Sequence, residues 1–183
     1  MKNSRFIKGV TGSLLGVFLL LGCSSTQSLQ EYYVDNSENP NFLALDVPAN
    51  ILKLDEASLD ETQRAALKSL RKLNILWFQK TAENANEYKA ETAKVKEILK
   101  NSDFKELMKL NTQYAKGVIK YSGEGDAIDE VVIYGDSQDK GFGLVRVLGD
   151  DMNPAHFMQL MQAIQKADVD GEGFKELVGL LKG

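Results

Sequence analysis

The chain has few of the side chains on which most enzyme chemistry depends. It contains one cysteine, Cys23, and one histidine, His156, in 183 residues. The chain therefore lacks the residues for zinc sites built on histidine and cysteine, for cysteine–histidine dyads with a free thiol, and for most serine–histidine–aspartate arrangements. A lone cysteine cannot form a disulfide within its own chain, so packing alone must stabilise the fold. Carboxylate, serine or lysine catalysis stays open.

The sequence also lacks an apolar run long enough to span a membrane. A spanning helix needs about 20 mostly apolar residues, whereas the run over residues 9–21 is shorter and is interrupted by glycine. It follows a basic start made of Lys2, Arg5 and Lys8. A basic start before a short apolar core is typical of a secretory signal peptide. We therefore predict export and removal of residues 1–22.

The apolar run ends in Leu20-Leu21-Gly22-Cys23, which resembles the lipobox of bacterial lipoproteins. There the cysteine sulfur takes a diacylglycerol as a thioether, the bond after Gly22 is cut, and the new α-amine can be acylated. Each buried CH₂ contributes about 0.8 kcal/mol, so several acyl chains, such as palmitate, on Cys23 make a lasting membrane anchor. The alternative is an exported protein with an unmodified thiol. The lipobox coincides with the chain's only cysteine, which favours the lipoprotein.

The chain that remains after export is acidic. Removing the leader leaves 161 of 183 residues, and it leaves 19 of the 22 basic residues against 26 acidic ones, for a net charge of −7. Such a chain has no electrostatic reason to bind the phosphate backbone of nucleic acids. Its length suffices for one domain with a substantial core.

Apolar periodicity predicts a single α+β domain over residues 42–183, after a lipidated cysteine and polar tether over residues 23–41. The expected core is an antiparallel sheet of about five strands, with a mixed edge, on which helices pack. Pro48 closes an edge strand, because proline is tolerated there. The run from Leu73 to Gln79 is apolar on both sides, which indicates a central strand.

Capping residues mark the expected helix starts. Asp60 with Gln63, and Asn84 with Glu87, have the spacing of capping boxes. Asn153 stands before a proline, a combination that begins many helices.

The segment that follows Met152 has two interpretations. An i, i+3, i+4, i+7 apolar stripe that begins at Phe157 predicts a C-terminal helix docked on the sheet. Met152, Met158 and Met161 beside Phe157 could instead line an adaptable apolar groove for a lipid or peptide. We expect a terminal helical segment after this helix, with apolar residues at Phe174, Leu177, Leu180 and Leu181.

Acidic residues gather at two of the expected turns, at Asp126, Asp129, Glu130, Asp150 and Asp151. They could converge to bind a cation or to form a glycosidase-like carboxylate pair. Acidic residues at turns more often cap and solubilise, and this is the favoured interpretation.

Three further motifs have simple structural interpretations. Residues 168–173 begin like a calcium loop, but Gly179 stands where a bidentate glutamate should close the site, so a turn is favoured and no metal is predicted. His156 lies in the first turn of its helix, where a partly exposed polar residue is expected. Gly141 and Gly143 lack the spacing of a phosphate loop and favour a bulge or a close approach within a strand.

Several segments together resemble a family of small lipoproteins from Bacteroidetes-type bacteria, catalogued as domain of unknown function 4252. They are residues 29–36, 42–48, 72–76, 104–108, 127–131 and, most specifically, Gly141-Phe-Gly-Leu-Val-Arg-Val-Leu-Gly-Asp-Asp-Met-Asn-Pro154. The family has no established activity, so the resemblance implies only an envelope lipoprotein of unassigned role. Surface-exported lipoproteins of such bacteria resemble one another in acidic residues after the acylated cysteine. Residues 24–30 contain none, so we expect the periplasmic face of the outer membrane.

Together these observations predict a non-enzymatic binding or accessory module. It would be anchored to the membrane through Cys23 and would bind an envelope protein through its sheet or C-terminal helices, without a cofactor. The alternative is a carrier or sensor of a small apolar ligand, and a carboxylate-based enzyme comes third.

Replacing the sulfur nucleophile tests the anchor. Cys23→Ser should abolish labelling by radioactive palmitate and should remove the mature-sized form from the membrane fraction of the cells, because serine cannot form the thioether. Labelling and fractionation of the two proteins check this. Recovery of the variant in membranes at unchanged size would contradict the prediction.

Overall fold

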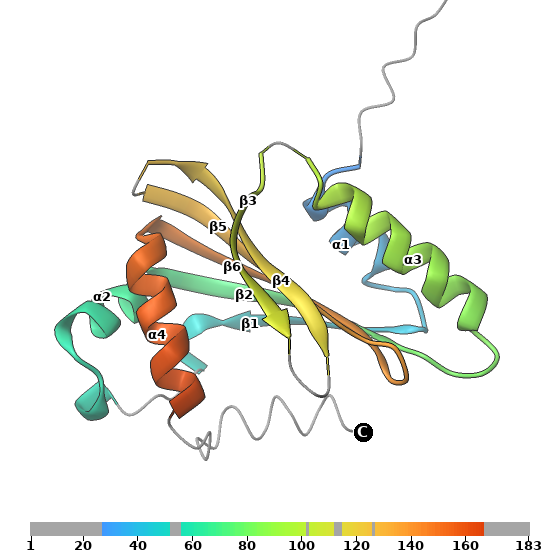
Figure 1. The fold of residues 1–183 in the computed structure, drawn as a ribbon, viewed down its shortest axis with the longest axis horizontal. Coiled ribbons are helices and arrows are strands. Elements are labelled where there is room, and N and C mark those ends of the chain that lie inside the picture. Colours follow the sequence, from blue (N-terminus) through green and yellow to red (C-terminus); the bar gives the residue numbers. More distant parts are fainter. Residues whose placement is uncertain (1–26, 52–55, 102, 112–114, 126, 167–183) are drawn as a thin grey trace, which may run out of the picture.

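The computed structural model describes residues 27–51, 56–101, 103–111, 115–125 and 127–166 (Figure 1). The leader, the lipobox, the calcium-like segment over residues 168–173 and the terminal segment predicted as helical all lie outside the described residues.

A six-stranded antiparallel sheet forms the centre of the fold, in the order β1-β2-β6-β5-β4-β3. The strands are β1 (Phe42–Pro48), β2 (Leu70–Gln79), β3 (Lys105–Asn111), β4 (Lys116–Glu124), β5 (Ala127–Ser137) and β6 (Gly141–Met152). The predicted α+β class and antiparallel sheet are confirmed, with one strand more than the five expected. The strand that ends at Pro48 lies at one edge, as predicted, and β2 is interior.

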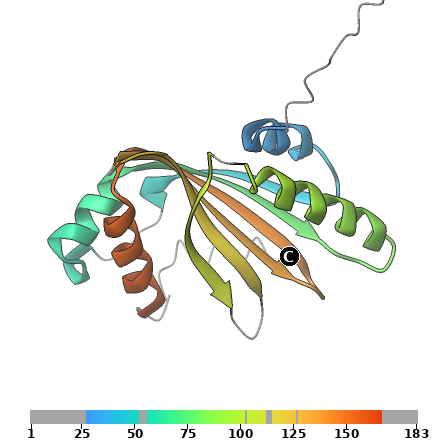
Figure 2. The ribbon, with the colours of Figure 1, turned by 45° about the horizontal axis from the view of Figure 1, so that its top comes forward.

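Helices lie on both faces of the sheet. They are α1 (Leu29–Asn36), α2 (Glu61–Ser69), α3 (Ala85–Ile98) and α4 (Pro154–Lys166), with short 3-10 turns η1 (Ala49–Ile51) and η2 (Glu56–Ser58). Figure 2 shows α1 and α3 on one side of the sheet and α4 on the other. Alternation along each strand divides the core accordingly, because successive side chains point to opposite faces.

The face under α1 and α3 has an aromatic core. Phe42, Phe78 and Phe142 come from three neighbouring strands, and the rings of Phe78 and Phe142 stack with their centroids 5.5 Å apart. Phe42 meets Phe78 edge to face at 5.0 Å. Val95 and Ile98 of α3 complete this cluster.

Segment 29–41 is folded, which corrects the predicted tether over residues 23–41. Ser28 caps α1 through a capping box with Glu31, and Tyr32 is completely buried. The ring of Tyr32 packs edge to face on Phe42, with centroids 6.2 Å apart. The segment is mostly polar, but Leu29 and Tyr32 form a short apolar stripe that docks the two turns of α1 on the core.

A buried carboxylate connects α1 to α3. Glu91 is 5 % exposed, and it accepts a hydrogen bond of 2.8 Å from the Tyr32 hydroxyl and one of 2.6 Å from the Lys94 ammonium. Burial, with the bond to Glu91 second, raises the pKa of Tyr32 above its ordinary value. The Tyr32 hydroxyl therefore keeps its proton at neutral pH and donates a hydrogen bond to Glu91.

One predicted capping box is confirmed and another is wrong. Asp60 and Gln63 form a reciprocal box at the start of α2. Asn84 precedes α3 but makes no side-chain cap. Its side-chain amide instead donates hydrogen bonds to the Gln79 carbonyl at 2.9 Å and to Oδ1 of Asn41 at 3.1 Å. These bonds connect the loop after β2 to the residue before β1. The expected cap at Asn153 is present, since its Oδ1 accepts hydrogen bonds from two backbone amides of α4.

Removal of the Tyr32 hydroxyl tests whether α1 belongs to the fold. Tyr32→Phe should lower the free energy of unfolding by about 1–3 kcal/mol, because one oxygen of the buried Glu91 loses its donor. Urea denaturation followed by circular dichroism measures this. Val34→Ala is the matched control on the same helix, because Val34 is 60 % exposed, and it should change stability by less than about 0.5 kcal/mol. Equal effects of the two substitutions would contradict the docking of α1.

Candidate functional site

Within the part of the chain that the structure describes, the sheet face opposite α1 and α3 is covered only at one end. There α4 lies across the strands, and Phe157 packs with Val47 of β1, Leu73 of β2 and Val147 of β6. These three strand residues are register partners, so they form one row across the sheet.

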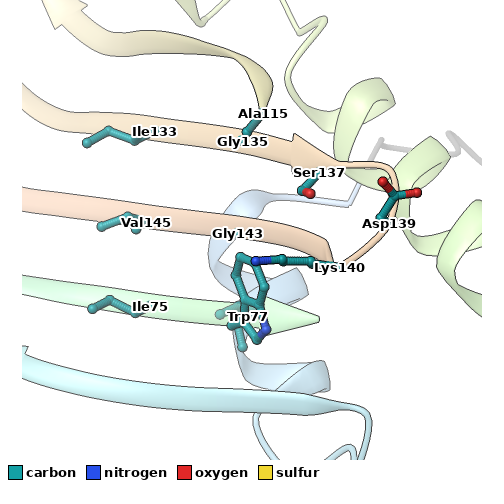
Figure 3. Close-up of a pocket in the computed structure, with 11 residues that line it drawn as sticks. Ile75, Trp77, Ala115, Ile133, Gly135, Ser137, Asp139, Lys140, Gly143 and Val145 are labelled. Atoms are coloured by element: carbon teal, nitrogen blue, oxygen red, sulfur yellow. The ribbon is translucent and has the colours of Figure 1, made fainter. Parts of the chain in front are cut away.

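Two more rows of the same face continue beyond α4. The first joins Ile75, Val145 and Ile133 across β2, β6 and β5, and the second joins Trp77, Gly143 and Gly135. We call these six residues the Trp77 trough. They line a depression of about 510 Å³, which ends at Ser137, Asp139 and Lys140 in the turn between β5 and β6. Figure 3 shows the side chains of Ile75, Val145 and Ile133 side by side, with Lys140 extending toward the Trp77 ring.

Glycines give the trough its depth. A Cβ atom on Gly143 would lie 3.3 Å from Cε3 of Trp77, so the absence of a side chain lets the ring lie against β6. A Cβ atom on Gly135 would meet no heavy atom within 4 Å, so the space above it is open. Gly117 of β4 pairs with Gly135, and glycine therefore occupies this row in three adjacent strands. The result is a floor of backbone without side chains beside one aromatic ring.

The chemistry of the trough suits binding more than catalysis. Trp77, Ile133 and Val145 are half-buried and offer apolar contact, and the charged groups of Asp139 and Lys140 stand at one end. Binding sites are commonly of this kind, mostly apolar with a few polar groups that orient the ligand. Among the described residues, histidine, cysteine and acidic side chains form no group of three that could hold a metal ion.

Comparison with known proteins identifies the family. The model of the family described as "Domain of unknown function (DUF4252)" matches residues 32–160, which is more than half of the chain. The chain belongs to the DUF4252 family. Its match begins at Tyr32 in α1 and ends at Leu160 in α4, so the DUF4252 domain includes the second half of the helix in the segment predicted as tether. No curated protein and no solved structure matches.

The methionine groove expected near the C-terminus of the DUF4252 domain is largely core. Met152 is completely buried and Phe157 is 2 % exposed, and Met161 packs against the same cluster. Met158 is half-buried. The apolar stripe of α4 is divided between the sheet, which Phe157 and Met161 contact, and α2, which Leu160 and Ile164 contact. Met152 and Phe157 are therefore removed from any binding surface.

The acidic residues considered for a carboxylate site have separate partners. Glu130 accepts a hydrogen bond of 2.7 Å from Nε of Arg146, and both side chains are largely buried. Asp150 forms an exposed ion pair of 3.2 Å with Arg71. Asp129 and Asp151 are exposed, and residue 126 lies outside the described residues. His156 is half-buried in the first turn of α4, where its backbone amide is capped.

A second hollow, of about 680 Å³, lies between α3 and the outer strands. Its lining includes Lys96, Lys100, Lys109, Lys116 and Lys120, together with Glu106, Asp136 and Asp139. Acidic neighbours or carbonyls engage four of these five lysines, as in the 3.4 Å pair of Lys96 with Asp136 and the bond from Lys120 to the Leu99 carbonyl. This hollow is therefore a largely neutralised, solvated surface.

Within the described ranges, every helix is too short or too polar to serve as a membrane span.

The glycines at the start of β6 confirm the predicted close approach. Gly141 has a φ of +122°, and a Cβ atom there would lie 1.8 Å from the Phe78 carbonyl oxygen. Sequence reasoning did not find the row of glycines beside Trp77, because only the strand register brings its members together.

The two glycines of the trough should respond differently to alanine. Gly135→Ala should leave the free energy of unfolding unchanged or raise it by up to about 1 kcal/mol, because the methyl enters open space and the unfolded chain loses freedom. Gly143→Ala should lower it by about 1–3 kcal/mol, since the methyl overpacks against Trp77. Urea denaturation and the emission of Trp77, the only tryptophan, measure both effects. Similar losses at both positions would refute the described shape of the trough.

Proposed function

We propose that this chain is an exported, acyl-anchored envelope lipoprotein whose DUF4252 domain binds a protein partner through the Trp77 trough. The observation that carries the proposal is the partly exposed apolar surface of Ile133, Val145 and Trp77 on a rigid antiparallel sheet. Apolar surface of this kind on a folded domain is characteristic of interaction sites.

Two details of the trough favour a protein partner. Tryptophan is enriched among the residues that dominate binding energy at protein interfaces. The open space above Gly135 provides a recess into which a partner's side chain can insert. The described acidic side chains support an enzyme less, because Glu130 and Asp150 are committed to separate arginines.

The lipobox and the basic, apolar leader support the anchoring part of the proposal. Acylation of Cys23 with diacylglycerol and palmitate would attach the protein to the outer membrane. Residues 24–30 lack acidic side chains, which favours the periplasmic face. This location would present the domain to other envelope proteins.

The second candidate function is a carrier or sensor of a small apolar ligand, and the trough volume of about 510 Å³ favours it. This volume is in the range of small-molecule sites. Native mass spectrometry of protein purified from its own membranes would reveal a retained lipid or metabolite.

Site-specific photocrosslinking in intact cells tests the proposal. A photoreactive phenylalanine analogue at Ile133 should give a discrete protein adduct after irradiation, because Ile133 lies in the trough. The same analogue at Val34, on the helix that covers the opposite face, is the control and should give none. Gel analysis and mass spectrometry of the adduct identify the partner. The proposal fails if position 133 gives no adduct, or if both positions give the same one.

A further inference from the structure

The Trp77 trough has the width of one helix. Packed helices lie about 8–10 Å apart. Alternate residues along a strand are about 6.6 Å apart, so the rows of Val145 and Gly143 lie about 7 and 13 Å from the row of Val147, which α4 covers. By the same count Gly141, where β6 begins, lies about 20 Å from Val147. A helix with its side chains is about 10–12 Å across, so the space between α4 and the turn before β6 admits one helix and not two.

The flank of α4 forms one wall of this space. Phe157 packs on the sheet and Leu160 packs toward α2. Figure 1 shows α2 on the side of α4 away from the turn between β5 and β6. Successive residues of a helix are turned by about 100°, so Met158 lies about 160° round the helix from Leu160, on the flank that faces the trough. Its side chain is half-buried, and methionine adapts readily to a neighbouring apolar surface.

The floor of the trough suits a helix better than an extended segment. The row of Trp77, Gly143, Gly135 and Gly117 crosses four adjacent strands. Three strand spacings are about 14 Å, which is the length of about ten helical residues. The space above Gly135 admits a large side chain. An extended segment would gain no backbone hydrogen bonds on this face, because such segments add to the edge of a sheet.

The turn between β5 and β6 forms the other wall and adds one positive charge. Figure 3 shows Lys140 extending toward the Trp77 ring, whereas the carboxylate of Asp139 points away from it. Among the described residues Lys140 forms no ion pair. Charges at the rim of an interface contribute more to orientation and selectivity than to affinity. A carboxylate of the ligand beside Lys140 would therefore fix the direction in which the ligand lies.

We propose that an amphipathic helix of the partner protein, about ten residues long, occupies the Trp77 trough, an inference that rests on the proposed function. Its apolar stripe lies on the floor of the trough, with one large side chain in the space above Gly135. One flank of the helix packs against Met158, and an acidic residue on the other flank contacts Lys140. The partner's helix thus covers the part of the sheet that α4 leaves uncovered among the described residues.

The spacing of crosslinks measures the conformation of the occupant. A photoreactive phenylalanine analogue is placed at Trp77 or at Ile133 of the full chain in intact cells. These positions lie two strands apart, which is about 10 Å. A helix that crosses the strands should be linked through residues about six or seven apart, because each residue rises about 1.5 Å. An extended segment should be linked through residues about three apart. Mass spectrometry of the two adducts identifies the linked residues.

The outcomes separate the helix from the proposed function. No protein adduct at either position rejects both. Any spacing other than the helical one, or an adduct at only one position, rejects the helix and leaves the protein partner standing. A link within one chain, or between two copies of it, also overturns the helix of a partner protein, and the mass of the adduct shows which of these has formed.

Matched substitutions on α4 test the first wall. With the photoreactive group at Ile133, Met158→Asp should lower the adduct yield at least about fivefold, because a charge would be buried against the helix. Gln159→Asp adds the same charge at the next, exposed position and should leave the yield unchanged. Thermal unfolding followed by circular dichroism shows whether both variants are folded. Equal yields from the two folded variants would overturn the placement of the helix beside α4.

Carbodiimide crosslinking tests the second wall. This reagent joins an amine to a carboxylate, so it should link Lys140 to an aspartate or glutamate of the partner segment that the photoreactive group at Ile133 captures. Lys140→Arg keeps the positive charge without the amine, and it should abolish the carbodiimide link while the photoadduct persists. Peptide mass spectrometry detects both links. A photoadduct without any carbodiimide link at Lys140 would overturn the acidic flank.

Discussion

The pairing register of β2, β6 and β5 is the constraint on which the rest of the structure depends. It aligns Phe78 with Phe142 on one face of the sheet and Trp77 with Gly143 on the other. The two pairs are adjacent along both strands, so they point to opposite faces. A slip of one residue would exchange the two faces completely. The aromatic stack under α3 and the depression on the far side are therefore consequences of a single alignment. The close approach of Gly141 to the Phe78 carbonyl stands at the end of that alignment.

The two faces of the sheet are completed in different ways. On the aromatic face, polar residues connect the helices to the sheet and to one another, as Tyr32 and Lys94 do at Glu91. Tyr88 of α3 also donates to Asp136 of β5, and burial, with this bond second, raises the pKa of Tyr88 to about 12. On the other face, α4 relies on apolar contact, with a matching apolar seam to α2 through Leu160 and Ala66. Hydrogen bonds therefore fix the position of the helices on the aromatic face. The described part of the other face retains half-buried apolar side chains that can make further contacts.

Much of the fold could be predicted from local sequence. The class, the edge position of the strand before Pro48, the cap at Asp60 and the C-terminal helix all depend on neighbours within a few residues. The failures involve contacts between distant segments. Asn84 has the spacing of a cap but binds Asn41 instead, and Tyr32 lies in a polar segment but packs edge to face on Phe42. The trough could not be predicted, because a glycine in one strand says nothing about which residues pair with it.

The docking of α1 has a consequence for how the protein would stand on a membrane. Because α1 is capped at Ser28, only residues 24–27 would separate an acyl group on Cys23 from this docked helix. At no more than about 3.5 Å per residue, the greatest length of these four residues is less than the thickness of a lipid leaflet with its headgroups. The folded domain would lie close to the bilayer, with α1 nearest to the membrane surface. Trp77, on the opposite side of the sheet, would then face away from the membrane toward the aqueous compartment.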